Sequence, residues 1–86
     1  MNTHEDKSEH SSNLTTLFSE RLITAMNLRD ISNKQLAQKI FVAPSTISSY
    51  RTGHRIPNLE QLILISTTLQ VSSDYLLGLS DTVSIN

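Results

Sequence analysis

The sequence predicts an all-α fold, and three observations support that class. Apolar residues recur at helical spacing in several segments, residues that begin or end helices flank these segments, and no segment alternates convincingly as a β-strand does. The 86 residues are 37% hydrophobic and include only two glycines, which is typical of a small helical domain. We expect five helices in one domain over residues 14–81, between a flexible polar arm at 1–13 and a tail at 82–86.

The first two helices are expected to be joined by a short turn. The first runs from about Thr16 to Leu28, where four apolar residues recur at helical spacing. They are Phe18, Leu22, Ala25 and Met26. The second begins after Ser32, because Ser32 and Gln35 have the spacing of a capping box. Its buried stripe is expected to comprise Leu36, Ala37 and Ile40.

A third helix is predicted from Pro44 to about residue 52. Proline suits the first position of a helix, because the N–H that it lacks would have no partner there. Ile47 and Tyr50 are expected to face inward, and Gly53 to end the helix in the left-handed conformation.

The fourth and fifth helices follow the same pattern of caps and apolar residues. Asn58 and Gln61 form a second cap-and-return pair at the start of the fourth helix. Its apolar face is expected to hold Leu59, Leu62, Ile63, Ile65 and Leu69. Ser72 caps a short fifth helix that ends at Gly78. That helix carries Tyr75, Leu76 and Leu77, and residues 79–86 form either a frayed tail or a short extended piece.

The formal net charge of −1 is distributed unevenly along the chain. Residues 28–55 hold five basic residues against one acidic residue, a net +4, whereas residues 56–86 hold three acidic residues and no basic one. The positive charge coincides with the second and third helices and the loop after them. Because local field rather than total charge attracts a polyanion, this segment indicates a surface for nucleic acid. The alternative is a basic face that is merely solvated.

Other classes of protein are disfavoured by what the sequence lacks. Without cysteine there is neither a disulfide framework nor a thiolate metal site. No apolar run approaches the roughly 18 residues of a membrane span, and the first residues lack a signal-peptide core, so we expect a soluble, cytoplasmic protein. No serine has the setting of a nucleophile elbow, and His4, His10 and His54 lack the spacing of metal ligands. We therefore expect no enzyme activity, no metal and no cofactor.

A long set of residues between Phe18 and Asp81 matches one family pattern without a gap. The set comprises Leu22, Ile31, Ser32, Leu36, Ala37, Val42, Ser45, Thr46, Ile47, Ser48, Tyr50, Gly53, Pro57, Leu59, Glu60, Leu62, Val71, Ser72, Asp74, Tyr75, Leu76, Leu77 and Gly78. On these residues the chain resembles the DNA-binding domain of Cro and the phage repressors, also called the xenobiotic-response-element family. The resemblance implies a five-helix, lambda-repressor-like bundle that contains a helix-turn-helix and binds double-stranded DNA. Such proteins are transcriptional regulators of bacteria or phages and are usually homodimers.

The resemblance also implies which residues contact DNA. Base edges would be read from Pro44, Ser45 and Ser49. Phosphate contacts would come from Asn33, Lys34, Thr46, Arg51, Thr52, His54 and Arg55. This division fits helix-turn-helix docking, in which the first turn of the recognition helix enters the major groove and its flanks meet the backbone.

Several positions depart from the family pattern. Pro44 has no side-chain donor and the serines are short, so we expect weak direct readout, with specificity from DNA shape, bridging water or paired half-sites. The alternative is that Arg51 or Arg55 reads the bases. Arg51 stands where the family usually has glutamate, and a surface side chain with a packed stem is as well supported as a phosphate contact. Phe41 and Asp30 replace common glycines, which predicts strained or altered turns.

Some apolar residues are not needed for the helix stripes and point to a partner. Leu64 lies off the core stripe of the fourth helix, where the family more often has a polar residue. We expect a two-fold dimer interface at Leu64, Tyr75, Leu79 and Val83. It would place two recognition helices about 34–36 Å apart, one turn of DNA. Scattered surface hydrophobes, with Ile23 and Ile85 among them, are the alternative.

The sequence therefore predicts a sequence-selective transcriptional regulator. We expect a repressor that inserts its third helix, at about 44–52, into the major groove and excludes polymerase from a promoter. The alternative is a protein-interaction module on the same fold, such as an antitoxin or an antirepressor-binding regulator, with a regulatory protein as its partner. An antitoxin arm would be apolar and foldable, whereas residues 1–13 are polar.

Overall fold

A computed structural model of the chain describes residues 3–84, with side chains from Thr15 onward. Its elements are α1 (Thr3–Arg29), α2 (Asn33–Ile40), α3 (Pro44–Thr52), α4 (Leu59–Leu69) and α5 (Ser73–Leu76). Within residues 3–84 the β-structure amounts to one isolated bridge between Val71 and Ser84. The predicted all-α class with five helices is therefore confirmed.

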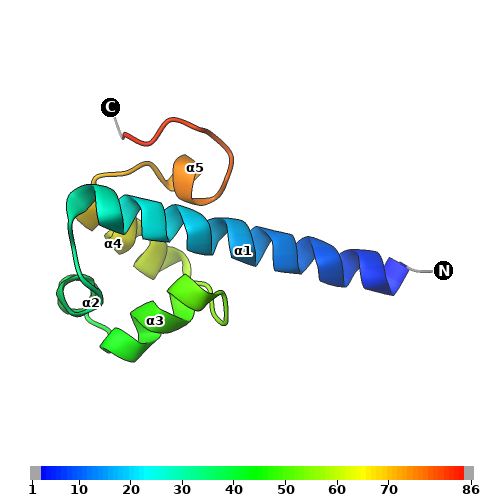
Figure 1. Cartoon of the computed structure of the whole chain (residues 1–86), viewed down its shortest axis with the longest axis horizontal. Helices are drawn as coiled ribbons and strands as arrows, with labels where there is room; N and C mark the ends of the chain where they lie inside the picture. Colours follow the sequence, from blue (N-terminus) through cyan, green and yellow to red (C-terminus); the bar gives the residue numbers. More distant parts are fainter. Residues whose placement is uncertain (1–2, 85–86) are drawn as a thin grey trace.

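The long helix α1 is the axis on which the other helices are arranged. Figure 1 shows α2 and α3 on one side of it and α5 on the other, with its N-terminal part projecting beyond them. At about 1.5 Å per residue, its 27 residues span about 40 Å. Because α1 packs against α3, α4 and α5, it connects the helix pair α2–α3 to the C-terminal part of the fold.

The predicted start of the first helix, near Thr16, was wrong, because α1 begins at Thr3. Residues 3–13 of the expected arm are helical backbone, and Met1 and Asn2 lie outside the described residues. Sequence reasoning located this helix by its apolar stripe, which residues 3–13 lack. Neither glycine nor proline occurs before residue 30, however, so nothing in the sequence interrupts the helix. The domain limits at 14–81 stay a prediction.

One apolar core joins all five helices, and most of the predicted stripes contribute to it. Its buried members are Phe18, Leu22, Ala25, Met26, Leu36, Ala37, Ile40, Ile47, Tyr50, Leu62, Ile65, Leu69, Val71, Tyr75 and Leu76. Three predicted core residues are exposed instead: Leu59 at 72%, Ile63 at 53% and Leu77 at 44%. In α4 the spacing of Leu62, Ile65 and Leu69 already fills the face toward the core, which leaves Leu59 and Ile63 on its flank.

The predicted helix starts are confirmed, with one difference. The Ser32 hydroxyl accepts from the Gln35 N–H at 3.1 Å and the Gln35 carboxamide accepts from the Ser32 N–H at 2.9 Å, which completes the capping box. Asn58 accepts from the Gln61 N–H at 2.8 Å. The return bond of that second pair was predicted wrongly, because the Gln61 side chain accepts a hydrogen bond from the Tyr50 hydroxyl instead. This bond ties α4 to α3.

Three helices end at non-glycine residues with positive φ. These are Asp30 at 54°, Phe41 at 64° and Gln70 at 55°. The expectation that Phe41 adopts a strained conformation is confirmed, and its side chain is 83% exposed. A left-handed conformation costs a residue with a Cβ about 1–2 kcal/mol. At Phe41 the gain is a bond from its N–H to the Ala37 carbonyl, which closes the end of α2.

Two arginines of α1 fasten the C-terminal part of the chain. The Arg29 guanidinium donates to the Leu69 carbonyl at 2.7 Å and to the Gln70 carbonyl at 2.9 Å, so it caps the end of α4. Arg21 lies 4.3 Å over the Tyr75 ring and donates to the Ser80 carbonyl at 2.9 Å.

The segment after α5 is an extended piece rather than a frayed tail as far as Ser84. The Ser72 N–H donates to the Val83 carbonyl at 2.7 Å, and the Ser72 hydroxyl donates to the Thr82 carbonyl at 3.1 Å. Ile85 and Asn86 lie outside the described residues.

Candidate nucleic-acid interface

The geometry of α2 and α3 follows from their buried stripes and from the three residues between them. Leu36, Ala37 and Ile40 of α2 and Ile47 and Tyr50 of α3 are buried in the common core. In the turn, the Val42 N–H donates to the Ala37 carbonyl at 3.0 Å. Both helices are thereby fixed against α1 and α4, and α3 leaves its opposite side free.

That opposite side of α3 carries only small hydroxyl residues. Ser45, Ser48, Ser49 and Thr52 recur at helical spacing on the face opposite Ile47 and Tyr50, and we call these four residues the hydroxyl face. Ser45, Ser48 and Thr52 are exposed and Ser49 is half-buried, and Pro44 is exposed at the first position of the helix. The predicted base-contact residues Pro44, Ser45 and Ser49 therefore lie on the accessible side of α3. Ser48 lies on the same face and was not among the predicted contacts, although its spacing from Ser45 and Ser49 places it there.

A chain of hydrogen bonds links the hydroxyl face to the start of α2. Arg51 Nη1 donates to Asn33 Oδ1 at 2.5 Å, and Asn33 Nδ2 donates to Ser48 Oγ at 3.1 Å. We call these three residues the Arg51–Asn33–Ser48 network. Beside it, the surface forms a hollow of about 320 Å³, lined by Ile23, Asn33, Ser48, Arg51 and Thr52. Arg51 is thus half-buried and bonded within the fold, which sequence reasoning did not foresee.

The loop after α3 is shaped by Gly53, whose φ of 85° turns the chain away from the helix axis as predicted. The Ser49 carbonyl accepts from the His54 N–H at 3.0 Å and from the Arg55 N–H at 3.2 Å. His54 Nδ1 lies 2.7 Å from the Thr52 hydroxyl. The loop therefore holds Thr52, His54 and Arg55, three of the predicted phosphate contacts, together at the C-terminal end of α3.

Of the five basic residues between 28 and 55, two use their guanidinium groups within the fold: Arg29 donates to carbonyl groups at the end of α4, and Arg51 donates to Asn33. Lys34, Lys39 and Arg55 are exposed. Burial raises the pKa of the Tyr50 phenol, and the positive charge of Arg55 opposes this rise. The nearby guanidinium therefore favours the ionised form of the phenol, although the burial effect is larger.

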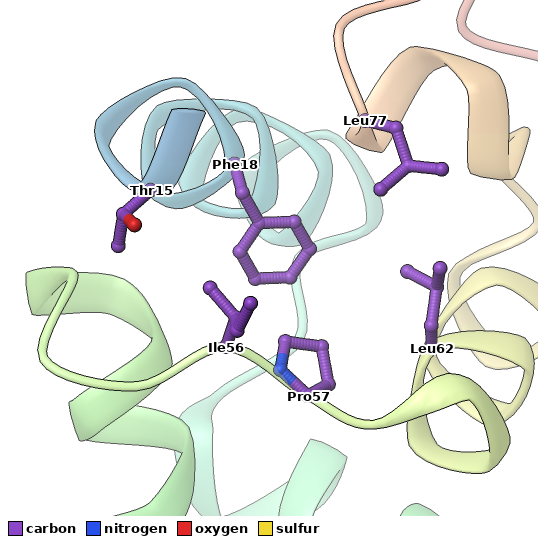
Figure 2. Close-up of a pocket in the computed structure, with 6 residues that line it drawn as sticks. All are labelled: Thr15, Phe18, Ile56, Pro57, Leu62 and Leu77. Carbon is purple, nitrogen blue, oxygen red and sulfur yellow. The ribbon is translucent and has the colours of Figure 1, made fainter. Parts of the chain in front are cut away.

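The predicted dimer residues occupy different environments. Tyr75 is only 8% exposed, and Leu64 and Val83 pack against the core, whereas Leu79 is 74% exposed. A separate apolar cavity of about 230 Å³ lies among α1, the loop before α4, α4 and α5. Figure 2 shows its lining side chains directed toward one another: Thr15, Phe18, Ile56, Pro57, Leu62 and Leu77.

Among the helices described, none combines the length and hydropathy needed to cross a membrane. Within the same part of the chain, no group of three His, Cys, Asp or Glu side chains is placed to hold a metal ion. The side chains of His4 and His10 lie outside the described residues.

Comparisons with known proteins agree with this geometry. A family model described as helix-turn-helix matches residues 22–76, which include α2, α3, α4 and α5 in full. The chain is 32% identical over 65 residues to the uncharacterized HTH-type transcriptional regulator YobD of Bacillus subtilis, covering 76% of this chain and 58% of YobD.

Two further relatives carry more specific names. The HTH-type transcriptional regulator ImmR of Bacillus subtilis is 34% identical over 59 residues, covering 69% of this chain and 46% of ImmR. The HTH-type transcriptional activator BcrR of Enterococcus faecalis is 29% identical over 68 residues, covering 79% of this chain and 33% of BcrR. The chain thus spans between a third and about three fifths of the length of these relatives.

The family match covers α3, which carries the hydroxyl face, α2 beside it, and most of the core that supports both helices. The resemblance to Cro and the phage repressors is thereby confirmed. The chain belongs to the helix-turn-helix family.

Proposed function

We propose that this chain is a sequence-selective DNA-binding transcriptional repressor that inserts α3 into the major groove. The observation that carries the proposal is the hydroxyl face, three of whose four residues are exposed. The names of the relatives, all HTH-type transcriptional regulators, support regulation as the role. No catalytic step, metal or cofactor enters this function, and it is carried out in the cytoplasm.

In the proposed complex, Pro44, Ser45 and Ser49 meet base edges while residues on both flanks of α3 meet phosphates. Asn33 and Lys34 lie at the start of α2, and His54 and Arg55 lie in the loop after α3. The backbone contacts would therefore bracket the recognition helix on two sides. Thr46 adds a neutral hydroxyl near the start of α3, whereas the Thr52 hydroxyl at its end is bonded to the Ser49 carbonyl and lies 2.7 Å from His54 Nδ1.

We also propose that the chain binds DNA as a homodimer. Leu79 remains the accessible member of the predicted interface, and Ile56, Leu59, Ile63 and Leu77 are further exposed apolar side chains. Ile56 and Pro57 belong to the same loop as His54 and Arg55, so a second copy seated at the apolar cavity would lie beside the same duplex. Leu79→Glu and Leu77→Glu should raise the dimer dissociation constant, as measured by sedimentation, and an unchanged dimer would remove these residues from the interface.

Repression follows if the bound dimer covers promoter sequence and excludes polymerase. Because BcrR is named an activator, the direction of regulation needs its own test. A reporter gene placed behind the selected site should fall in expression when the protein is produced. A rise in expression would assign activation instead.

The central experiment is selection from random duplexes, followed by affinity measurements over a salt series. Each phosphate contact should contribute a slope of about −0.9 to the plot of log affinity against log salt concentration. Ser49→Glu, which places a negative charge on the hydroxyl face, should weaken binding at least hundredfold. Thr67→Glu is the matched control, because Thr67 is an exposed hydroxyl residue of α4 outside the interface. A flat slope with no enriched sequence would favour the protein-interaction module.

A further inference from the structure

The Arg51–Asn33–Ser48 network fixes the orientation of a carboxamide at the edge of the proposed interface. A guanidinium carries only hydrogen-bond donors, so the Asn33 atom that faces Arg51 is the carbonyl oxygen. The amide nitrogen of Asn33 must then face Ser48, to whose hydroxyl it donates at 3.1 Å. Without Arg51 the carboxamide could reverse and present its oxygen to Ser48.

This orientation decides what the Ser48 hydroxyl can do. A hydroxyl has one proton to donate and two lone pairs. Asn33 occupies one lone pair, and among the described residues no group accepts the Ser48 proton. Ser48 is exposed on the hydroxyl face, so its proton is free for an acceptor outside the protein. A reversed Asn33 would instead accept that proton and leave Ser48 as an acceptor only.

We propose that Ser48 donates a hydrogen bond to an acceptor on a base edge, and that Arg51 is a positioning residue that acts on Ser48 through Asn33. The inference rests on the proposed function and specifies the chemical group on the DNA that α3 recognises. In the major groove the acceptors are guanine N7 and O6, adenine N7 and thymine O4, whereas cytosine presents a donor. Cytosine can use only the remaining lone pair of Ser48, so the site should prefer a base that offers an acceptor over cytosine at the position that faces Ser48.

The assignment differs from a phosphate contact by Arg51 in measurable ways. A phosphate contact contributes through its charge, weakens all duplexes about equally when removed, and lowers the salt slope by about one. A positioning residue changes the preference for one base pair and leaves the salt slope in place. The effect of removing Arg51 also disappears in a variant that already lacks the Ser48 hydroxyl, because Arg51 acts on the base pair only through Ser48.

The experiment begins with the duplex that the wild-type protein selects, and with every single-base-pair variant of that duplex. Binding is measured at several salt concentrations for Ser48→Ala, Arg51→Met, Arg51→Lys and the double variant Ser48→Ala with Arg51→Met. Arg51→Lys keeps a side chain that carries only donors, so it can still orient the Asn33 carboxamide. Lys39→Met is the matched control, because it removes one exposed positive charge outside the network.

Ser48→Ala should weaken binding to the selected duplex about three- to tenfold and remove the preference at one base pair. Arg51→Met should remove the same preference, the double variant should be no weaker than the weaker single variant, and Arg51→Lys should keep the preference. None of these variants should change the salt slope by more than Lys39→Met does. Thermal unfolding confirms that each variant is folded. If Arg51→Met is not, Asn33→Ala replaces it, and the readout is the loss of the preference at that one base pair rather than the overall affinity.

Two results would overturn the inference while leaving the proposed function intact. One is that the wild-type protein selects a sequence, but Ser48→Ala leaves every base preference unchanged. The other is that Arg51→Met loses affinity for all duplexes alike and has a smaller salt slope, and that its loss of binding free energy adds to that of Ser48→Ala. Failure of the wild-type protein to select any sequence would instead contradict the proposed function itself.

Discussion

The region formed by α2, α3 and the following loop differs from the region formed by α4, α5 and the tail in how each uses its surface. The first region is basic and presents small hydroxyl groups, whereas the second contains only acidic charges and presents exposed leucine and isoleucine side chains. Both regions contribute buried side chains to one core. The comparison teaches that a small chain with a net charge near zero can divide a basic polar face and an apolar face between two halves of one bundle.

The largest effect should come from Gly78, which joins the second region to α1. Its φ is 80°, and a Cβ added there would lie 2.2 Å from Leu17 Cδ2. Gly78→Ala should lower the free energy of unfolding by about 2–3 kcal/mol, measured by urea denaturation. Duplex affinity of the folded variant should be unchanged. A loss of affinity at full folding would show that the two regions do not act separately.

Removal of the arginine that holds the tail should have a slightly smaller effect. Arg21→Met loses the hydrogen bonds to the Tyr75 and Ser80 carbonyls and the contact with the Tyr75 ring. We expect a loss of about 2 kcal/mol in urea denaturation, mostly from the unpaired carbonyls. Asp81→Asn is the control, because the Asp81 side chain is fully in solvent and its ion pair with Arg21 contributes little.

A charge change in each region sharpens the contrast between them. Arg55→Glu should weaken binding to all duplexes about tenfold and reduce the salt slope, because it removes a cation from the first region. Glu60→Gln, in the second region, should leave affinity nearly unchanged. Fluorescence anisotropy with the selected duplex and an unrelated duplex measures both variants. Equal effects of the two substitutions would contradict the division of the surface.

The bond between Tyr50 and Gln61 connects the two regions and gives a pH dependence. Tyr50→Phe should cost about 1 kcal/mol at neutral pH, because it leaves the Gln61 oxygen without its donor. Burial raises the pKa of Tyr50 above its usual 10.0, so the neutral phenol is the form that favours folding. Its contribution is complete below the unfolded pKa and is lost as pH rises through the folded pKa. The stability difference between wild type and Tyr50→Phe should therefore shrink above about pH 10, as followed by urea denaturation at each pH.

The smallest effect is a gain in stability at the turn between α2 and α3. Phe41→Gly should stabilise the fold by about 0.5–1 kcal/mol, because it relieves a positive φ and removes a side chain that is 83% exposed. Phe41→Ala keeps the strained conformation and should give no gain. Thermal unfolding of both variants measures the difference, and a destabilised Phe41→Gly would mean that the exposed ring makes contacts that stabilise the turn.

Local sequence patterns predicted the helix starts and most of the core, because caps and apolar spacing act over a few residues. Ser32 with Gln35, Pro44, and Gly53 all behave as their local chemistry requires. The start of α1 was missed because residues 3–13 have no apolar stripe to mark a helix. Leu59 and Ile63 were misplaced because the neighbours of α4, rather than its own sequence, decide how wide its buried face is.

The partners of long polar side chains could not be predicted from the sequence. Arg29 caps α4, forty residues away along the chain, and Arg51 reaches Asn33 on another helix. Such pairs depend on how helices are arranged in space, and a cation in a basic segment gives no sign of being used inside the fold. The predicted contact positions on α3 and in the loop after it lie on the accessible side, and their roles stay predictions.

The shortness of the side chains on α3 has a consequence for the groove that would receive it. Serine and threonine reach base edges only if the helix backbone itself comes close, so little space remains for extra atoms on the DNA. In the proposed complex, a C5 methyl group under α3, on thymine or on a methylated cytosine, would lie closer to the helix backbone than it would for a helix bearing glutamine or arginine. Binding by this chain would then depend on the methylation state of its site.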